Sequence, residues 1–154
     1  MSANMIDEIL AAYDWFDHPE GPFKFAETHR DAHRTSGHWL FLPGSFSSFH
    51  KVSNNAELWL IHLGRLTVHV LDPDGTHHAL RLGTDLAAGE RPVVAVPVNY
   101  WQAAEIPEGT PFAFGTVVCA PAFSYEEFAI ARREDLLREF PDHADLITRL
   151  TRDD

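Results

Sequence analysis

The chain has 154 residues, of which 45% are hydrophobic, and a formal net charge of −11. This length is typical of one domain that buries roughly two-thirds of its unfolded surface, so we expect a single domain over residues 1–154. The negative charge argues against nucleic acid or an anionic membrane as partner, because both are bound by basic patches. Cys119 is the only cysteine, and the sequence shows neither a signal peptide nor an apolar run of ~20 residues, which predicts a cytoplasmic protein.

The N-terminal segment predicts a helix followed by a turn. Apolar residues recur at helical spacing over residues 4–14, and this spacing predicts a short amphipathic helix. Proline and glycine at 18–22 predict a turn, and a strand is expected at 23–29. Short apolar runs separated by turn residues then predict further strands at 36–42, 47–52, 57–63, 65–71, 76–82, 93–97, 101–106 and 112–119.

Beyond Pro121 the apolar pattern becomes helical again. Two short helices are expected at 133–140 and at about 144–150. The sequence therefore predicts an all-β fold of jelly-roll type, with a short N-terminal helix, a core barrel at about 23–120 and a helical C-terminal tail.

Both faces of the predicted strand at 57–63 carry mainly apolar residues. Trp59 and Ile61 share one side, and Leu58 and Leu60 share the other. An antiparallel strand with one solvated face would alternate with polar residues instead. We therefore expect one side to face the barrel interior and the other to face a second layer or a partner subunit, which favours a homodimer.

A glycine-bounded segment, residues 44–64, holds one histidine, His50, and one carboxylate, Glu57, near the ends of two predicted strands. Its spacing resembles the first motif of the cupin superfamily, which is a glycine, five residues, His-x-His, three or four residues, Glu, six residues and Gly. Val52 stands where that motif has its second histidine. The resemblance implies a cupin jelly-roll β-barrel with His50 and Glu57 at its mouth.

Residues 97–102, Pro-Val-Asn-Tyr-Trp-Gln, are similar to the second cupin motif, which is a glycine, Pro-x-Gly, two residues and a histidine. Asn99 replaces a glycine of that motif, and asparagine tolerates the same left-handed backbone. Gln102 stands where the third metal-binding histidine would be.

Further short motifs recur in one order over about residues 15 to 130. Together they resemble the small cupin subfamily long catalogued as a domain of unknown function, whose members are similar in fold to the dTDP-sugar epimerases. The chain departs from that subfamily around the expected pocket, at Leu60, His62, Val93, Pro22 and Ala122. The motifs that carry the resemblance include His18-Pro-Glu-Gly21, Glu27-Thr28, Ser48-Phe-His50, Glu57-Leu-Trp59, Gly89-Glu90-x-Pro92, Trp101-Gln-Ala-Ala104 and Ala120-Pro-x-Phe123.

His50 and Glu57 form a candidate acid–base pair. A histidine near its neutral pKa suits proton abstraction, and a neighbouring carboxylate orients the ring and raises its basicity. The dTDP-sugar epimerases use a histidine base and a tyrosine acid, and by position Tyr100 is the candidate acid here. The first hypothesis is a small-molecule enzyme of the isomerase, epimerase, dehydratase or cyclase type. Its substrate would be positioned by Trp59, Trp101 and Gln102.

Two other hypotheses stay open. His50, Glu57 and Gln102 could hold one divalent transition metal in a metal-dependent enzyme such as a dioxygenase, whereas the proton-transfer hypothesis requires no cofactor. The third hypothesis is a non-catalytic cupin that binds a small ligand. In all three the partner is a small molecule.

Overall fold

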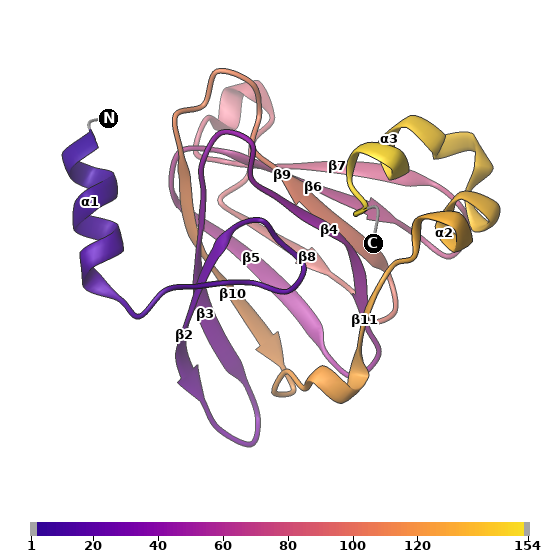
Figure 1. The fold of residues 1–154 in the computed structure, drawn as a ribbon, viewed down its shortest axis with the longest axis horizontal. Coiled ribbons are helices and arrows are strands. Elements are labelled where there is room, and N and C mark those ends of the chain that lie inside the picture. Colours follow the sequence, from indigo (N-terminus) through magenta and orange to yellow (C-terminus); the bar gives the residue numbers. More distant parts are fainter. Residues whose placement is uncertain (1–2, 153–154) are drawn as a thin grey trace.

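The computed structural model describes residues 3–152, which form two antiparallel sheets flanked by short helices (Figure 1). The helices are α1 Ala3–Ala12, α2 Arg133–Glu139 and α3 Ala144–Arg149, with 3-10 turns η1 Leu86–Ala88, η2 Tyr125–Glu127 and η3 Pro141–His143. The strands are β1 Phe16–Asp17, β2 Lys24–Arg30, β3 Thr35–Phe41, β4 Phe46–Val52, β5 Ala56–Leu63, β6 Leu66–Leu71, β7 His77–Leu82, β8 Val93–Val96, β9 Trp101–Glu105, β10 Ala113–Ala120 and β11 Phe128–Ile130.

The sheet topology is that of a jelly roll. One sheet has the order β1-β2-β3-β10-β5-β8 and the other has the order β11-β4-β9-β6-β7. Every strand expected from the sequence is present, and each end differs by at most one residue. The predicted all-β fold with a short N-terminal helix and C-terminal helices is therefore confirmed. The short strands β1 and β11 were not predicted.

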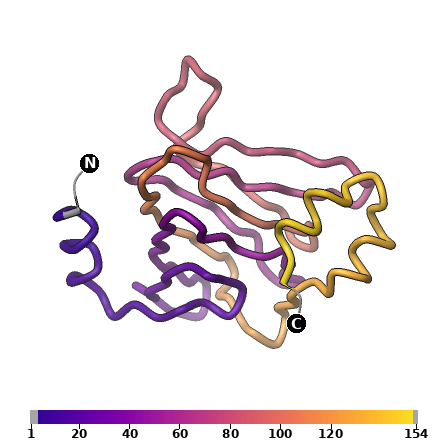
Figure 2. Tube along the Cα trace, turned by 45° about the horizontal axis from the view of Figure 1, so that its top comes forward, coloured from indigo at the N-terminus to yellow at the C-terminus, as the bar shows by residue number. Residues whose placement is uncertain are grey.

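The main core lies between the two sheets, where Trp39, Phe41 and Trp59 pack against residues of β6 and β9. The helices form outer layers on opposite sides of the barrel (Figure 2). Residues of α2 and α3 cover the five-stranded sheet through Phe49 and Leu71, and α1 covers the buried Leu40. No helix within residues 3–152 has the length and apolar character needed to cross a membrane.

The outer side of β5 is the side expected to face a second layer or a partner subunit, and in the single chain it is partly exposed. Glu57, Trp59 and Ile61 face inward and are buried, whereas Leu58 is 43% exposed and His62 is exposed. Cover of the outer side of β5 within this chain is partial, since Leu60 is half-buried and the His62 ring contacts His38 and Phe114. The homodimer therefore stays a prediction.

The turn before β9 has the backbone that its sequence predicts. Asn99 has φ 65°, in the left-handed region that asparagine tolerates. Its N–H donates to the carbonyl of Val52 at 3.0 Å, which ties this turn to the end of β4. Gln102 then lies opposite His50 in the β4–β9 register.

Candidate functional site

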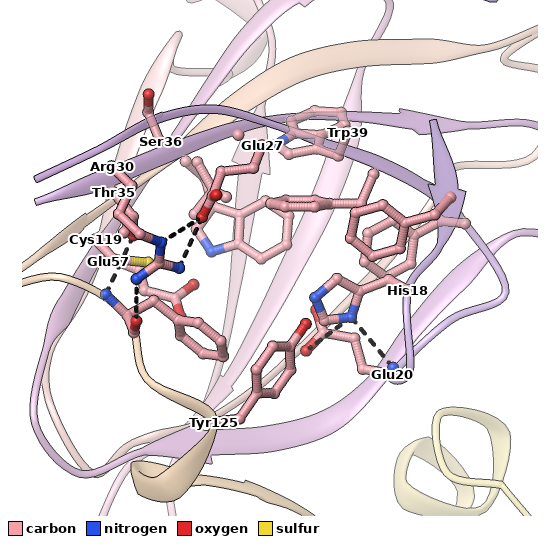
Figure 3. Close-up of a pocket in the computed structure, with 17 residues that line it drawn as sticks. His18, Glu20, Glu27, Arg30, Thr35, Ser36, Trp39, Glu57, Cys119 and Tyr125 are labelled. Carbon is pink, nitrogen blue, oxygen red and sulfur yellow. Dashed lines mark hydrogen bonds and ion pairs between the residues drawn. The ribbon is translucent and has the colours of Figure 1, made fainter. Parts of the chain in front are cut away.

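A cavity of about 250 Å³ lies on the inner face of the six-stranded sheet (Figure 3). Strands β1, β2, β3, β5 and β10 supply its walls, and the segments around residues 18–23 and 123–125 complete it. Its surface is largely aromatic, with polar groups at a few places. The aromatic lining residues are Phe16, Phe23, Phe25, Trp39, Trp59, Phe123 and Tyr125.

Glu57 is a buried carboxyl group that reaches this cavity from β5. It lies opposite Cys119 on β10, and the Cys119 thiol and the Gln102 amide both donate to it. The Trp59 indole N–H donates to Gln102 Oε1 at 2.9 Å, so the Gln102 NH₂ group is left to face Glu57. Burial raises the pKa of Glu57 to about 7, although His50 and these donors act in the opposite direction. A carboxyl group with this pKa exchanges a proton near neutral pH.

His50 lies behind the cavity, where it meets a second carboxyl group. Its Nδ1 lies 2.8 Å from the Ser48 carbonyl oxygen, which can only accept, so Nδ1 carries the proton of the neutral ring. Its Nε2 lies 3.4 Å from Glu20 Oε2. Burial lowers the pKa of His50, despite the nearby Glu57 charge, and burial also raises the pKa of Glu20. These two pKa shifts favour the state in which both side chains are uncharged and one proton is shared between Glu20 and His50.

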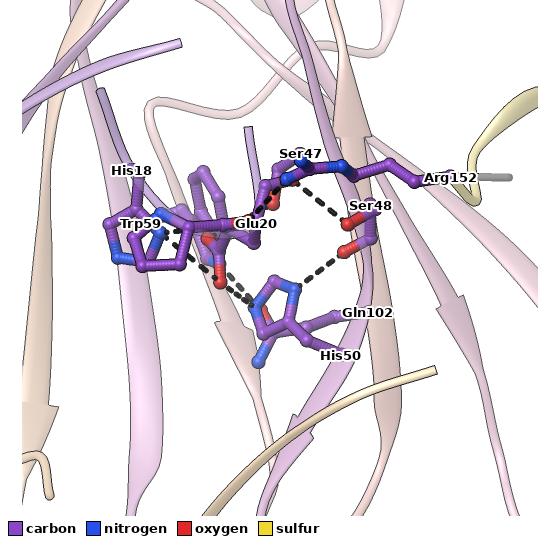
Figure 4. A network of polar contacts seen from close by, with 9 residues as sticks. His18, Glu20, Ser47, Ser48, His50, Trp59, Gln102 and Arg152 are labelled. Atoms are coloured by element: carbon purple, nitrogen blue, oxygen red, sulfur yellow. Dashed lines mark hydrogen bonds and ion pairs between the residues drawn. The ribbon is translucent and has the colours of Figure 1, made fainter. Parts of the chain in front are cut away.

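A tight turn places Glu20 at the barrel wall, and β4 holds it there (Figure 4). The Ser47 hydroxyl donates to Glu20 Oε1 at 3.0 Å, and the Ser48 N–H and hydroxyl donate to the Glu20 backbone carbonyl. Arg152 donates to the carbonyl of Pro19 at 2.5 Å. A Cβ on Gly21 would lie 2.5 Å from the backbone nitrogen of Phe23, so only glycine fits the turn without a backbone shift.

His18 begins this turn and also lines the cavity. Its Nδ1 accepts the Glu20 backbone N–H at 3.2 Å, so Nε2 carries the proton of the neutral ring. The ring stacks on Phe23 at 5.2 Å and lies 6.5 Å from the Tyr125 ring. Burial lowers the pKa of His18, even though Glu20 acts in the opposite direction. His18 is thus a neutral donor beside Glu20 and Tyr125.

The structure brings together some of the site residues expected from the sequence. His50, Glu57 and Gln102 are adjacent and buried, and Trp59 lines the cavity. His50, expected as the base, is not a lining residue and sits behind Glu20.

Two other expected site residues lie away from the cavity. Trp101 is next to Gln102 on β9 and so points to the opposite face, where it packs against the C-terminal helices and under Lys51. Tyr100 packs against the barrel core without lining the cavity. The tyrosine that does line it is Tyr125.

The donor set does not fit a metal ion. No group of three or more His, Cys, Asp or Glu side chains within residues 3–152 is arranged to hold one. The Gln102 oxygen accepts from Trp59, and His50 directs Nδ1 to a backbone carbonyl and Nε2 to Glu20. We therefore derive no step through a metal ion.

Sequence reasoning missed Glu20, His18 and Tyr125 as site residues. The segment His18-Pro-Glu-Gly21 predicts a turn and also carries part of the family resemblance, and that combination is the available signal for Glu20 and His18. Tyr125 carries no signal, because it stands in the single 3-10 turn η2 between β10 and β11, which is too short to show a period. Cys119 is buried, and burial raises the pKa of its thiol well above its ordinary value.

A jelly-roll barrel with this strand order defines a protein of the cupin class. The sequence profile described as "Cupin superfamily (DUF985)" matches residues 7–131, so the chain belongs to this family. None of the curated proteins compared with it matches.

Solved structures of similar fold come from several organisms. Protein SO0799 from Shewanella oneidensis is 26% identical with a TM-score of 0.88, over 100% of this chain and 99% of that one. A hypothetical protein from Leishmania major is 21% identical with a TM-score of 0.86, over 98% and 99% of the two chains. Pac13 from Streptomyces, a nucleoside dehydratase, is 11% identical with a TM-score of 0.55, over 77% and 84%.

Proposed function

We propose that this protein is a small-molecule enzyme that catalyses proton transfer, of the dehydratase or isomerase type. The observation that carries the proposal is the pair of buried carboxyl groups, Glu57 and Glu20, with raised pKa values at an aromatic cavity. Burial without a full counter-charge is unfavourable for folding, and such groups cluster at functional sites.

In this proposal Glu57 is the base that meets the substrate. At neutral pH a large fraction of Glu57 is ionised, and the carboxylate takes a proton from a carbon next to a carbonyl group of the substrate. For a dehydration, the bond to a hydroxyl group on the neighbouring carbon then breaks. Protonated Glu20 gives its proton to that hydroxyl as it leaves as water. This step leaves Glu57 protonated and Glu20 ionised.

His50 is a positioning residue in this scheme. In the neutral ring Nε2 carries no proton and lies 3.4 Å from Glu20 Oε2, so it accepts the proton of Glu20 and holds that carboxyl group in its protonated form. This differs from the sequence-based hypothesis, in which His50 is the base and Glu57 its partner. The difference rests on which side chain reaches the cavity, because Glu57 lines it and His50 does not.

The nucleoside dehydratase activity of Pac13 is a property of that protein, and at 11% identity the likeness extends to the fold. The likeness supports the proposal in one respect, because it shows that a barrel of this fold can catalyse the elimination of water.

The test is solvent deuterium incorporation. Purified protein is incubated in D₂O with a panel of hydroxylated carbonyl compounds, sugars and nucleosides, and each compound is followed by mass spectrometry and proton NMR. We expect at least one compound to gain deuterium or lose water with the wild-type protein, and not with Glu57→Gln. Glu108→Gln removes one exposed carboxylate outside the cavity and is the matched control. Equal turnover by Glu57→Gln and wild type would refute the role of Glu57.

A further inference from the structure

The mouth of the cavity carries one cationic side chain, Arg30, and its charge is matched by a carboxylate. Arg30 Nε and Nη2 donate to Glu27 Oε1 at 3.0 and 2.7 Å, and Nη1 donates to the Phe123 carbonyl at 3.0 Å (Figure 3). Arg30 is the only Lys or Arg among the lining residues. Its positive charge is therefore already paired with a carboxylate, in an ion pair whose two side chains are each close to half exposed at the edge of the cavity.

A backbone irregularity creates this ion pair. Residues three apart on a regular strand point to opposite faces of the sheet. The register of β2 against β3 shifts between Glu27 and His29, which inserts one extra residue. The shift brings Glu27 and Arg30 to the same side, and bulges near sites often re-aim side chains in this way. The pairing is therefore built into the strand.

The remaining charges of the cavity are negative or neutral. Glu20 and Glu57 line its floor, and His18 is held neutral by burial. An anionic ligand would leave water for a site with no unmatched cation and with carboxyl groups close by, which is unfavourable. The whole chain has a net charge of −11, so its field also repels an approaching anion.

The shape of the cavity indicates what it accepts. At about 250 Å³ it is slightly smaller than the ~300–1,000 Å³ of typical ligand pockets, which suits a compact ligand. Phe16, Phe25 and Trp39 offer flat apolar surfaces for a ring. The Tyr125 hydroxyl and the Glu57 carboxyl can bond to hydroxyl groups of that ring.

We propose that the cavity selects an uncharged, hydroxylated ring compound over its phosphorylated counterpart, and that Glu27 sets this selection by neutralising Arg30. The inference rests on the proposed function only in taking this cavity as the substrate site. It identifies the chemical class of the substrate and adds Glu27 as a specificity-determining residue.

The test compares matched pairs of ligands in binding experiments that need no turnover. The probes are uridine with uridine 5′-monophosphate, thymidine with thymidine 5′-monophosphate, and glucose with glucose 6-phosphate. Binding is followed by ligand-observed NMR and by tryptophan fluorescence. We expect a neutral member to bind the wild-type protein at least about tenfold more tightly than its phosphate, a difference of about 1.4 kcal/mol.

Substitution of Glu27 tests the cause of the selection. In Glu27→Gln the guanidinium of Arg30 keeps its charge without a matching carboxylate, so the preference should fall to within roughly threefold. Glu108→Gln changes the net charge equally and should keep the tenfold preference. Tighter binding of phosphates by wild type, an unchanged preference in Glu27→Gln, or no binding by any neutral member overturns the proposal.

The two proposals fail in different ways. If neutral compounds bind selectively but none exchanges deuterium or loses water, the proposed chemistry is wrong and the selection stands. If deuterium exchange occurs with phosphorylated compounds in preference to neutral ones, the selection is wrong and the chemistry stands. Repeating the binding series with Glu57→Gln keeps turnover out of the measurement.

Discussion

Replacement of Glu57 by glutamine tests the electrostatic basis of the site through protein stability. Burial raises the pKa of this carboxyl group from 4.5 to about 7. Between these pH values the unfolded chain loses the proton while the folded chain keeps it, so stability falls as pH rises through this window. One proton contributes about 1.4 kcal/mol per pH unit, so ionisation of Glu57 lowers the free energy of unfolding by about 3 kcal/mol between pH 4 and pH 8.

The assay is urea unfolding at pH 4, 6 and 8, followed by circular dichroism. Glu57→Gln has no group to ionise at this position, so its stability relative to wild type should rise by about 3 kcal/mol from pH 4 to pH 8. Contributions from carboxyl groups far from Glu57, such as Glu105, are the same in both proteins and cancel in the difference. For Glu108→Gln, the free energy of unfolding plotted against pH should run parallel to that of wild type.

Parallel curves for Glu57→Gln and wild type would refute the reasoning, because they would mean that Glu57 has an ordinary pKa in the folded protein. The same pKa predicts an activity profile for the wild-type enzyme. Turnover should increase as pH rises through about 7, where Glu57 becomes ionised.

Three further substitutions test the geometry of the site and the association of the chain. Tyr125→Phe should weaken ligand binding by about 0.5–1.5 kcal/mol in a titration, because one hydrogen bond to the ligand is lost. Tyr100→Phe should bind as tightly as wild type, and equal losses of affinity in the two variants would contradict the placement of Tyr125 alone at the cavity. Gly21→Ala should lower the free energy of unfolding by roughly 1–3 kcal/mol in urea and reduce turnover, because the added Cβ displaces the turn that carries Glu20. Unchanged turnover would argue against a role for the Glu20 carboxyl group. Leu58→Glu should convert a dimer to a monomer by light scattering after gel filtration, and a monomeric wild-type protein would refute the homodimer.

The longer strands could be predicted because each is an apolar run with turn residues at both ends. Strands β1 and β11 have two and three residues and are too short to show a period. They are strands because their own residues pair in register with β2 and β4. The turn at Asn99 was predictable from one residue type, since few residues tolerate φ near 65°.

The site was predictable where two strands fix the geometry. His50 and Gln102 are opposite each other on β4 and β9, so motif spacing alone brought them together. Trp101 and Gln102 are neighbours on one strand and cannot both face the cavity, so strand alternation could have excluded Trp101. Glu20 could not be placed in this way, because its turn reaches the barrel wall through contacts with β4 that leave no periodic signal.

The hydrogen bond from Arg152 to Pro19 also bears on the order of folding. The two residues are 133 positions apart in the sequence, and a contact that closes so long a loop is entropically unfavourable until most of the chain is in place. The contact of the Glu20 turn with the C-terminal segment therefore forms late in folding, after the sheets have formed. In a refolding experiment, recovery of turnover should lag behind recovery of β-structure.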